Sequence, residues 1–204
     1  MKNIIVFLFL VSFLFVSCNS EDSIYNKETD NSNVISTINR VENKTTSQNT
    51  VQQNKQELTL QQLINQIEVD AMQDSGFTAL VDENYRTPLA TDIEAVLQDP
   101  TAVLLNLSIK SSVKNYVGNI LDTSTATDLF VVNQTIQNDI LMTTAEKNML
   151  TDVINLQSKH IQNNDGNDDD WNTRKIISYV QGYTISRANA VLNLLIINVI
   201  EKEN

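Results

Sequence analysis

SRANAVLNLLIINVI, residues 186–200, is the stretch that decides the fold class. From Ala190 onward its only polar residues are Asn193 and Asn198, so apolar side chains would lie on every side of a helix. Such a helix is covered by other elements all round, and its eleven residues from Ala190 are too few for a bilayer span, which takes about 20. We therefore predict that this stretch, capped by Ser186, is the central helix of a bundle.

The residues before it, from 57 onward, carry the apolar period of amphipathic helices. Leu60, Ile64 and Ile67, for example, recur at the spacing of one helix face. Local signals mark where the helices begin. The predicted capping boxes are Thr59 with Gln62 and Thr143 with Glu146, and the prolines at first helical positions are Pro88 after Thr87 and Pro100 after Asp99. Gly76 and Gly182 are predicted helix stops.

These signals predict an all-α fold, a single bundle of six to seven helices over residues 57–204. The helices are expected to begin near residues 59, 87, 100, 127, 143, 173 and 186. The third continues to residue 121; its early part, 103–109, also alternates apolar positions as a strand would, and we favour a helix there. The fourth is expected to bury Leu129, Val132, Ile136 and Ile140. A domain of this size buries roughly two thirds of its unfolded surface, enough for one core.

The composition excludes several other classes of protein. Four Gly and two Pro in 204 residues are too few for turn-rich sandwiches or propellers. Fourteen basic and 25 acidic side chains give a net charge of -11, which disfavours nucleic acid because that affinity comes largely from Lys and Arg. One His and one Cys provide neither a His-rich metal cluster nor an internal disulfide. We expect no nucleic-acid partner and no resident cofactor.

Residues 1–17 have the organisation of a secretory signal peptide. Lys2 supplies the basic start, and the apolar run 4–16, interrupted only by Ser12, has the length of a signal-peptide core. The run ends in Leu14-Phe15-Val16-Ser17-Cys18, apolar residues and a small residue before a cysteine. This stretch resembles the lipobox of bacterial lipoproteins.

The resemblance implies that the chain is cut before Cys18, which then carries a diacylglycerol on its sulfur and an acyl chain on its amino group. Two or more acyl chains anchor a protein stably, since each buried methylene contributes about 0.8 kcal/mol. The next residues, 19–22, read NSED and resemble the export signal of Gram-negative lipoproteins displayed on the outer face of the outer membrane. We expect a lipid-anchored envelope protein at the outer membrane, on the cell surface or on the periplasmic face.

Residues 18–56 have the composition of a tether between the lipidated cysteine and the folded domain. From residue 19 to 56, 22 of 38 residues are Ser, Thr, Asn or Gln. We predict a disordered segment with a root-mean-square span of about 35 Å. The alternative is a short helix docked on the domain through apolar residues of this segment, which are Ile24, Val34, Ile35, Ile38 and Val41.

The acidic loop NNDGNDDD, residues 163–170, could supply oxygen ligands to a hard cation. Ca²⁺ takes six to eight oxygens from carboxylates and carbonyls. The candidate ligands are Asp165, Asn167, Asp168 and Asp169. An EF-hand does not fit, because aligning Gly166 with the required glycine puts Ile161 at the first ligand position. We favour a solvated loop that caps the following helix.

One histidine and three aromatic residues complete the candidate set. His160 is predicted at the C-terminus of the fifth helix, where a cation is favourable, rather than in a catalytic role. Trp171, Tyr179 and Tyr183 are spaced to share one face of the sixth helix, where rings stack on sugars or anchor a protein partner. Packing of these rings in the core is the alternative that we favour.

These residues predict a location more closely than an activity. The chain lacks a glycine-flanked serine nucleophile, a phosphate-cradling loop and a Glu-x-x-His pair. We therefore expect a non-enzymatic binding or interaction module with a protein or glycan partner. Two alternatives stay open: a periplasmic inhibitor or immunity-type lipoprotein against a basic partner, which the negative charge would suit, and an envelope hydrolase that uses carboxylates alone.

Overall fold

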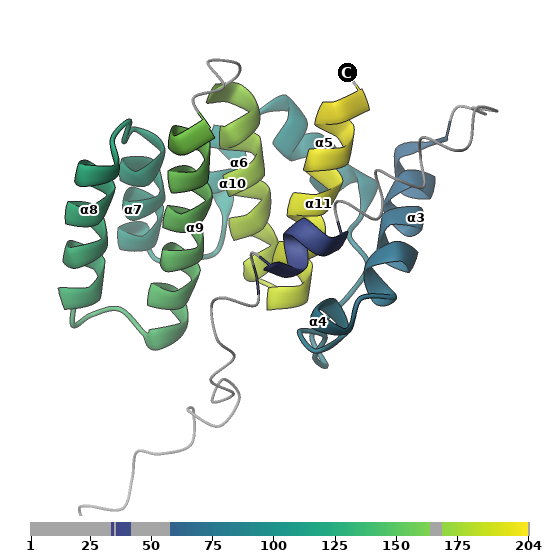
Figure 1. Cartoon of the computed structure of the whole chain (residues 1–204), viewed down its shortest axis with the longest axis horizontal. Helices are drawn as coiled ribbons and strands as arrows, with labels where there is room; N and C mark the ends of the chain where they lie inside the picture. Colours follow the sequence, from purple (N-terminus) through teal and green to yellow (C-terminus); the bar gives the residue numbers. More distant parts are fainter. Residues whose placement is uncertain (1–33, 35, 42–57, 164–168, 204) are drawn as a thin grey trace, which may run out of the picture.

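The described part of the chain consists of α-helices and their connections, as predicted (Figure 1). It comprises residues 34, 36–41, 58–163 and 169–203 of a computed structural model. The helices are α3 (Leu60–Met72), α4 (Ser75–Thr78), α5 (Ala90–Gln98), α6 (Pro100–Asn106), α7 (Ser111–Leu121), α8 (Ala126–Asn138), α9 (Thr144–Asn163), α10 (Asp169–Tyr183) and α11 (Arg187–Glu203). Among the described helices, none combines the length and the hydropathy that a bilayer crossing requires.

The C-terminal helix α11 is the central element of the bundle, as its sequence predicts. Its side chains from Val191 to Ile197 are buried on all sides of the helix. Helix α10 packs against one side of α11, and α3 and α4 cover another side of it (Figure 1). Because apolar residues occur all round α11, this complete coverage is what removes them from water.

Helices α7, α8 and α9 form a three-helix group at the far edge of the molecule (Figure 1). Each packs against the other two, and α9 joins the group to α10. Lys110, directly before α7, donates to the Leu141 carbonyl at 3.1 Å and to Glu146 at 2.9 Å, so α7 and α9 begin at the same end. Helix α8 runs in the opposite direction and forms the outer edge.

Most of the predicted helix starts are confirmed by hydrogen bonds. Both capping boxes form, Asp99 accepts from the Ala102 amide at 2.8 Å, and Ser186 accepts from the Asn189 amide at 3.0 Å. The start at Thr87 is wrong, since α5 begins at Ala90 without a cap from its own segment. Instead, Gln61 of α3 accepts from the Ala90 amide at 2.8 Å, a partner 29 residues away that no local pattern could indicate.

The predicted third helix is two helices, because the chain turns between Asn106 and Ser111. Residues 103–106 are helical, as we favoured, so the alternating apolar positions there did not indicate a strand. Leu104 and Val113 are both buried, yet nine residues of a straight helix would place them on opposite sides. The turn lets both side chains face the same core.

Part of the predicted tether is helical, as in the alternative interpretation. Residues 34 and 36–41, which we call the strap, are helical and lie against the domain. Val34, Ile38 and Val41 are buried in the main core, and Thr37 between them is buried too. So short a helix is marginal in water alone, so burial of this apolar side stabilises it. The other residues of the predicted tether lie outside the described part.

Two glycines are predicted as helix stops. The stop at Gly182 is confirmed to within one residue, since α10 ends at Tyr183, whereas Gly76 lies inside α4. Both glycines also have another role. A Cβ at Gly182 of α10 would lie 2.5 Å from the Asn189 carbonyl oxygen and 2.6 Å from the Ala190 nitrogen of α11. Gly76 lies in α4, where a Cβ would meet the side chains of Arg40 and Thr37 in the strap. Both positions lack a side chain because another segment occupies that space.

We expect Gly182→Ala to destabilise the protein by about 3 kcal/mol, because the backbone of α11 cannot give way as a flexible side chain could. The matched control is Gly118→Ala in α7, where a Cβ meets nothing within 4 Å. That variant should be unchanged or up to about 1 kcal/mol more stable, from its better helix propensity. Urea unfolding of both variants gives the comparison; equal stabilities would contradict the close approach.

Candidate functional site

Several residues singled out in the sequence lie outside the described part of the structure. These are Cys18 and three candidate calcium ligands, Asp165, Asn167 and Asp168. The fourth, Asp169, is exposed in the first turn of α10, where its Oδ1 lies 3.3 Å from His160 Nε2 at the end of α9. Within the described ranges, no three His, Cys, Asp or Glu side chains are grouped to hold a metal ion. The lipid anchor stays a prediction, and so does the solvated loop that we favour over a calcium site.

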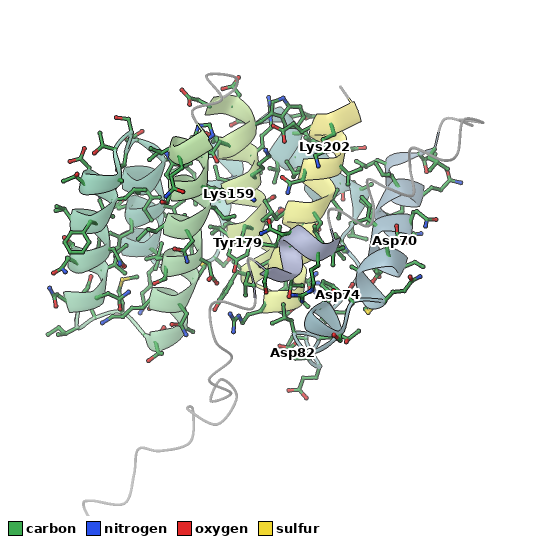
Figure 2. The ribbon with its side chains drawn as sticks, in the orientation of Figure 1. Asp70, Asp74, Asp82, Lys159, Tyr179 and Lys202 are labelled. Carbon is green, nitrogen blue, oxygen red and sulfur yellow. The ribbon has the colours of Figure 1, made fainter. Side chains whose placement is uncertain are left out.

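The three aromatic residues of α10 do not form one ligand-binding face. Tyr179 is fully buried, as the favoured core packing predicts, so it does not take part in a ligand-binding surface (Figure 2). Tyr183 is half-buried with its ring centroid 6.0 Å from that of Tyr179. Half-buried Trp171 lies under the Arg174 guanidinium, 4.9 Å from the ring centroid. Because α10 lies between α9 and α11, the face that carries Tyr179 points into the bundle.

The Tyr179 hydroxyl donates to the Asp152 carboxylate of α9 at 2.7 Å, and both residues are fully buried. Burial raises the pKa of Asp152 to about 6; the hydrogen bond from Tyr179 and the nearby Arg187 charge act in the opposite direction. The pKa of Tyr179 is likewise raised, mainly by burial. Asp152 Oδ1 has no hydrogen-bond partner among the described residues. Since the pair is closed off from solvent, we assign it a structural role between α9 and α10.

Other buried amide side chains also join separate segments. Asn189 of α11 donates to the Arg86 carbonyl at 2.6 Å and accepts from the Arg86 amide at 3.2 Å, so it holds the loop before α5 against α11. Asn172 donates to Gln157 at 2.6 Å, and Gln157 donates to the Thr123 carbonyl at 2.9 Å. These amides occupy the protein interior and are satisfied there.

Asp152 should make stability depend on pH. Its folded pKa, about 6, is above the ordinary value of 3.8, so the folded state holds a proton between those values that the unfolded state has lost. The stability from this group is therefore full below about pH 4 and is lost as the pH rises through 6.

Relative to Asp152→Asn, which cannot titrate, the wild-type free energy of unfolding should fall by about 2 kcal/mol from pH 4 to pH 8. Urea unfolding of both proteins at each pH measures the difference. A constant difference across that range would contradict the raised pKa.

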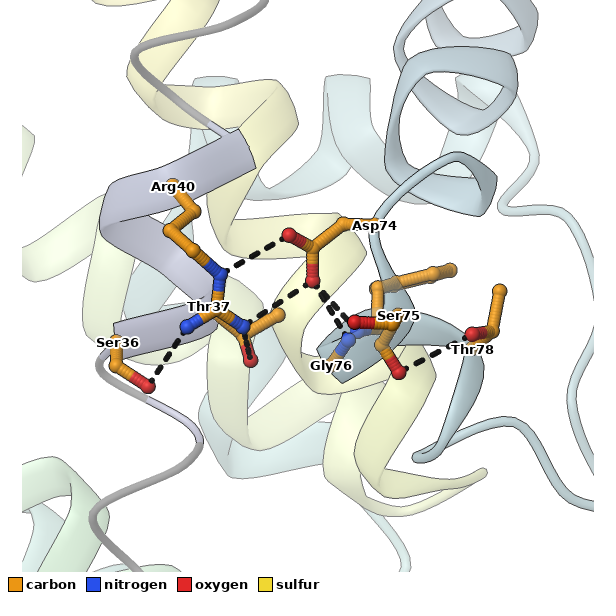
Figure 3. A network of polar contacts seen from close by, with 8 residues as sticks. Ser36, Thr37, Arg40, Asp74, Ser75, Gly76 and Thr78 are labelled. Atoms are coloured by element: carbon orange, nitrogen blue, oxygen red, sulfur yellow. Dashed lines mark hydrogen bonds and ion pairs between the residues drawn. The ribbon is translucent and has the colours of Figure 1, made fainter.

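The strap is held by polar contacts on both sides. On one side, Arg40 Nε lies 3.0 Å from Asp74 Oδ2, and Arg40 Nη2 lies 3.2 Å from Asp74 Oδ1 (Figure 3). The hydrogen bond from Arg40 is the largest cause of the lowered pKa of Asp74, which also caps α4 through the Gly76 amide at 2.8 Å. On the other side, Lys159 of α9 donates to Asn39 at 3.0 Å. The strap therefore bridges α4 and α9.

The sequence did not predict that apolar residues of α8 and of the turn after it would be exposed. Phe130 and Val131 are 62% and 58% exposed on α8, and Ile140 and Leu141 are 93% and 79% exposed in the turn before α9. Ile140, expected in the core, is exposed because α8 ends at Asn138. One signal was available: the run LFVV at 129–132 is wider than one helix face, so some of its members must face outward.

In comparisons with known proteins, no protein-family model, no curated protein and no solved structure matches the chain. Function is therefore inferred from the chain's own residues.

Proposed function

We propose that the mature chain is a lipid-anchored, non-enzymatic binding module of the outer membrane, and that α8 presents the face that binds a protein partner. The observation that carries this proposal is the pair Phe130 and Val131, two adjacent large apolar side chains that are more than half exposed. Exposed aromatic and aliphatic side chains that lie together on a surface are typical anchors of protein interfaces.

The anchor rests on the lipobox and on its distance from the domain. Leu14 to Cys18 supply the pattern, and the strap begins 16 residues after Cys18, at Val34. Sixteen residues span at most about 55 Å, at 3.3–3.6 Å each. Because the strap packs into the core, the acyl chains on Cys18 would hold the domain within that distance of the bilayer surface.

The chemistry of the α8 surface favours a partner that is not selected by charge. Asp128, in the first turn, is the only charged residue of α8, although the chain as a whole carries -11. The outward residues beside Phe130 and Val131 are amides and hydroxyls, namely Gln134, Thr135, Gln137 and Asn138. Helix α8 also lies at the edge of the bundle, with α7 and α9 on one side only (Figure 1). A face with an aromatic anchor and a single charge suits a partner bound by apolar contacts better than a basic partner bound by charge.

The anchor is tested by Cys18→Ala. Since lipid attachment needs the cysteine sulfur, this variant should lose incorporation of labelled palmitate and leave the membrane fraction. Asn19→Ala, which keeps the cysteine, should behave as the wild type. Palmitate labelling that persists in Cys18→Ala would show that the lipobox was misread.

The partner-binding face is tested by photo-crosslinking in intact cells. A photoreactive amino acid at Phe130 should give a discrete adduct with a second protein, whereas the same group at Leu89, which is 60% exposed elsewhere, should not. Phe130→Asp/Val131→Asp should reduce partner recovery at least tenfold, with Leu89→Asp as the matched control.

Raising the salt from 0.1 to 0.5 M should leave recovery nearly unchanged, because the anchors of the face are apolar and salt screens only interactions between charges. Equal amounts of adduct at both positions, or recovery that falls steeply with salt, would contradict the proposed face. The second result would favour the alternative of an inhibitor or immunity-type lipoprotein that binds a basic partner.

A further inference from the structure

A second exposed apolar surface lies at one end of the α7–α8–α9 group. It consists of Ile140 and Leu141 in the α8–α9 turn and of Leu105 at the end of α6, which Lys114 joins to the start of α7, and we call it the turn end. Ile140 and Leu141 are the most exposed large apolar side chains of the described residues. They lie on a turn rather than on a helix face, so they project from the end of the bundle, whereas Phe130 and Val131 lie along its side.

Three lysines lie near these apolar residues, two at the start of α7 and one in the first turn of α9. Lys110 donates to the Leu141 carbonyl at 3.1 Å, Lys114 donates to the Leu105 carbonyl at 2.5 Å, and Lys147 donates to the Gln137 carbonyl at 2.7 Å. Each contact places an ammonium group beside the turn end.

Two acidic residues also lie at this end, and both are engaged. Glu146 pairs with Lys110 at 2.9 Å, and Asp139 accepts from the Tyr116 hydroxyl at 3.1 Å. The turn end thus has three basic against two acidic side chains, within a chain that has 14 against 25. This local reversal of the charge balance coincides with the most protruding apolar residues.

We propose that the turn end docks on an anionic lipid bilayer, the one that holds the acyl chains of Cys18. Apolar side chains that project from a turn can enter the boundary between headgroups and acyl chains, while lysines around them contact the lipid phosphates. The proposal rests on the lipid anchor of the proposed function and adds to it a contact made by the folded domain.

The geometry of α9 brings the anchor and the turn end within reach of one bilayer. The strap meets α9 at Lys159, and the turn end lies at the start of this helix, at Thr144. Fifteen residues of helix separate the two points by about 22 Å. The strap begins 16 residues after Cys18, and this stretch spans at most about 55 Å, so the chain can place Cys18 in the membrane plane beneath the turn end.

Docking of the turn end need not be strong to be effective. Three apolar side chains and three lysines would bind a vesicle weakly from solution. Once lipid chains hold the protein on the bilayer, the second contact becomes intramolecular, and its effective concentration is in the millimolar range. The acyl chains would therefore provide residence on the membrane, and the turn end would provide orientation.

The first test uses the mature chain without lipid, residues 18–204 with Cys18→Ser, in a flotation assay with phospholipid vesicles. Vesicles with 30% phosphatidylglycerol should carry more protein than phosphatidylcholine vesicles, and Ile140→Asp/Leu141→Asp should lower the bound fraction at least fivefold. The matched control is Phe130→Asp/Val131→Asp, which adds the same charge to the side of α8 and should bind as the wild type. Lys114→Gln/Lys147→Gln should remove most of the preference for anionic lipid.

The second test uses the lipidated protein with Ile140→Cys, labelled with an environment-sensitive fluorophore; the Cys18 sulfur is already occupied by lipid. Emission should shift to the blue in vesicles and be quenched by spin-labelled lipid, whereas a label at Leu89 should respond to neither.

Equal vesicle binding by Ile140→Asp/Leu141→Asp and the wild type, or an unquenched label at position 140, would overturn the proposal. So would self-association in solution that the same double variant abolishes without any vesicle binding, since the turn end would then join two copies of the chain. Failure of palmitate labelling at Cys18 would overturn the anchor alone, because the flotation assay uses unlipidated protein.

Discussion

The close approach of α10 to α11 at Gly182 is the constraint on which the rest of the bundle depends. A side chain at this position would lie 2.5 Å from the backbone of α11, so the two helices can pack this closely only because the residue is glycine. Helix α11 is apolar on all sides, and α10 covers only one of them. The remaining sides require α3, α4 and, over part of the surface, the strap. The arrangement of the other helices around α11 therefore follows from the composition of α11 and from its close contact with Gly182.

Close packing of α9, α10 and α11 also places polar groups in the interior, where each must find a partner in another segment. Tyr179 meets Asp152 across α10 and α9, and Asn189 meets both backbone groups of Arg86. Apolar contacts tolerate small sliding movements, whereas these bonds form only at one relative position of the helices. Asp152 shows that this arrangement has a cost, because burial disfavours its charged form at neutral pH. We infer that these residues fix the helix register rather than maximise stability.

The features that could be predicted from the sequence are those encoded within one or two turns of chain. The boxes at Thr59 and Thr143, the cap at Asp99 and the all-round apolar pattern of α11 are local, and each is confirmed. The features that could not be predicted depend on distant segments: Gln61 caps α5, the strap fills the space above Gly76, and Leu104 and Val113 share a core only because the chain turns between them. The candidate site follows the same division. Ile140 fits the helical period of α8, and only the end of that helix at Asn138 makes it exposed.

The positions of the strap, the turn end and the α8 face are all compatible with one orientation of the protein on a bilayer. The strap and the turn end lie near opposite ends of α9, about 22 Å apart along its axis. Contact of the turn end with lipid would therefore set α9 and the antiparallel α8 at a steep angle to the membrane plane. Phe130 and Val131 lie along the side of α8, so in this orientation they would face a neighbouring molecule rather than the lipid. An anchor of acyl chains alone allows the domain every orientation, and a second contact that selects one of them lowers the entropy lost when the partner binds. On this view the lysines and apolar residues of the turn end contribute to partner binding without touching the partner.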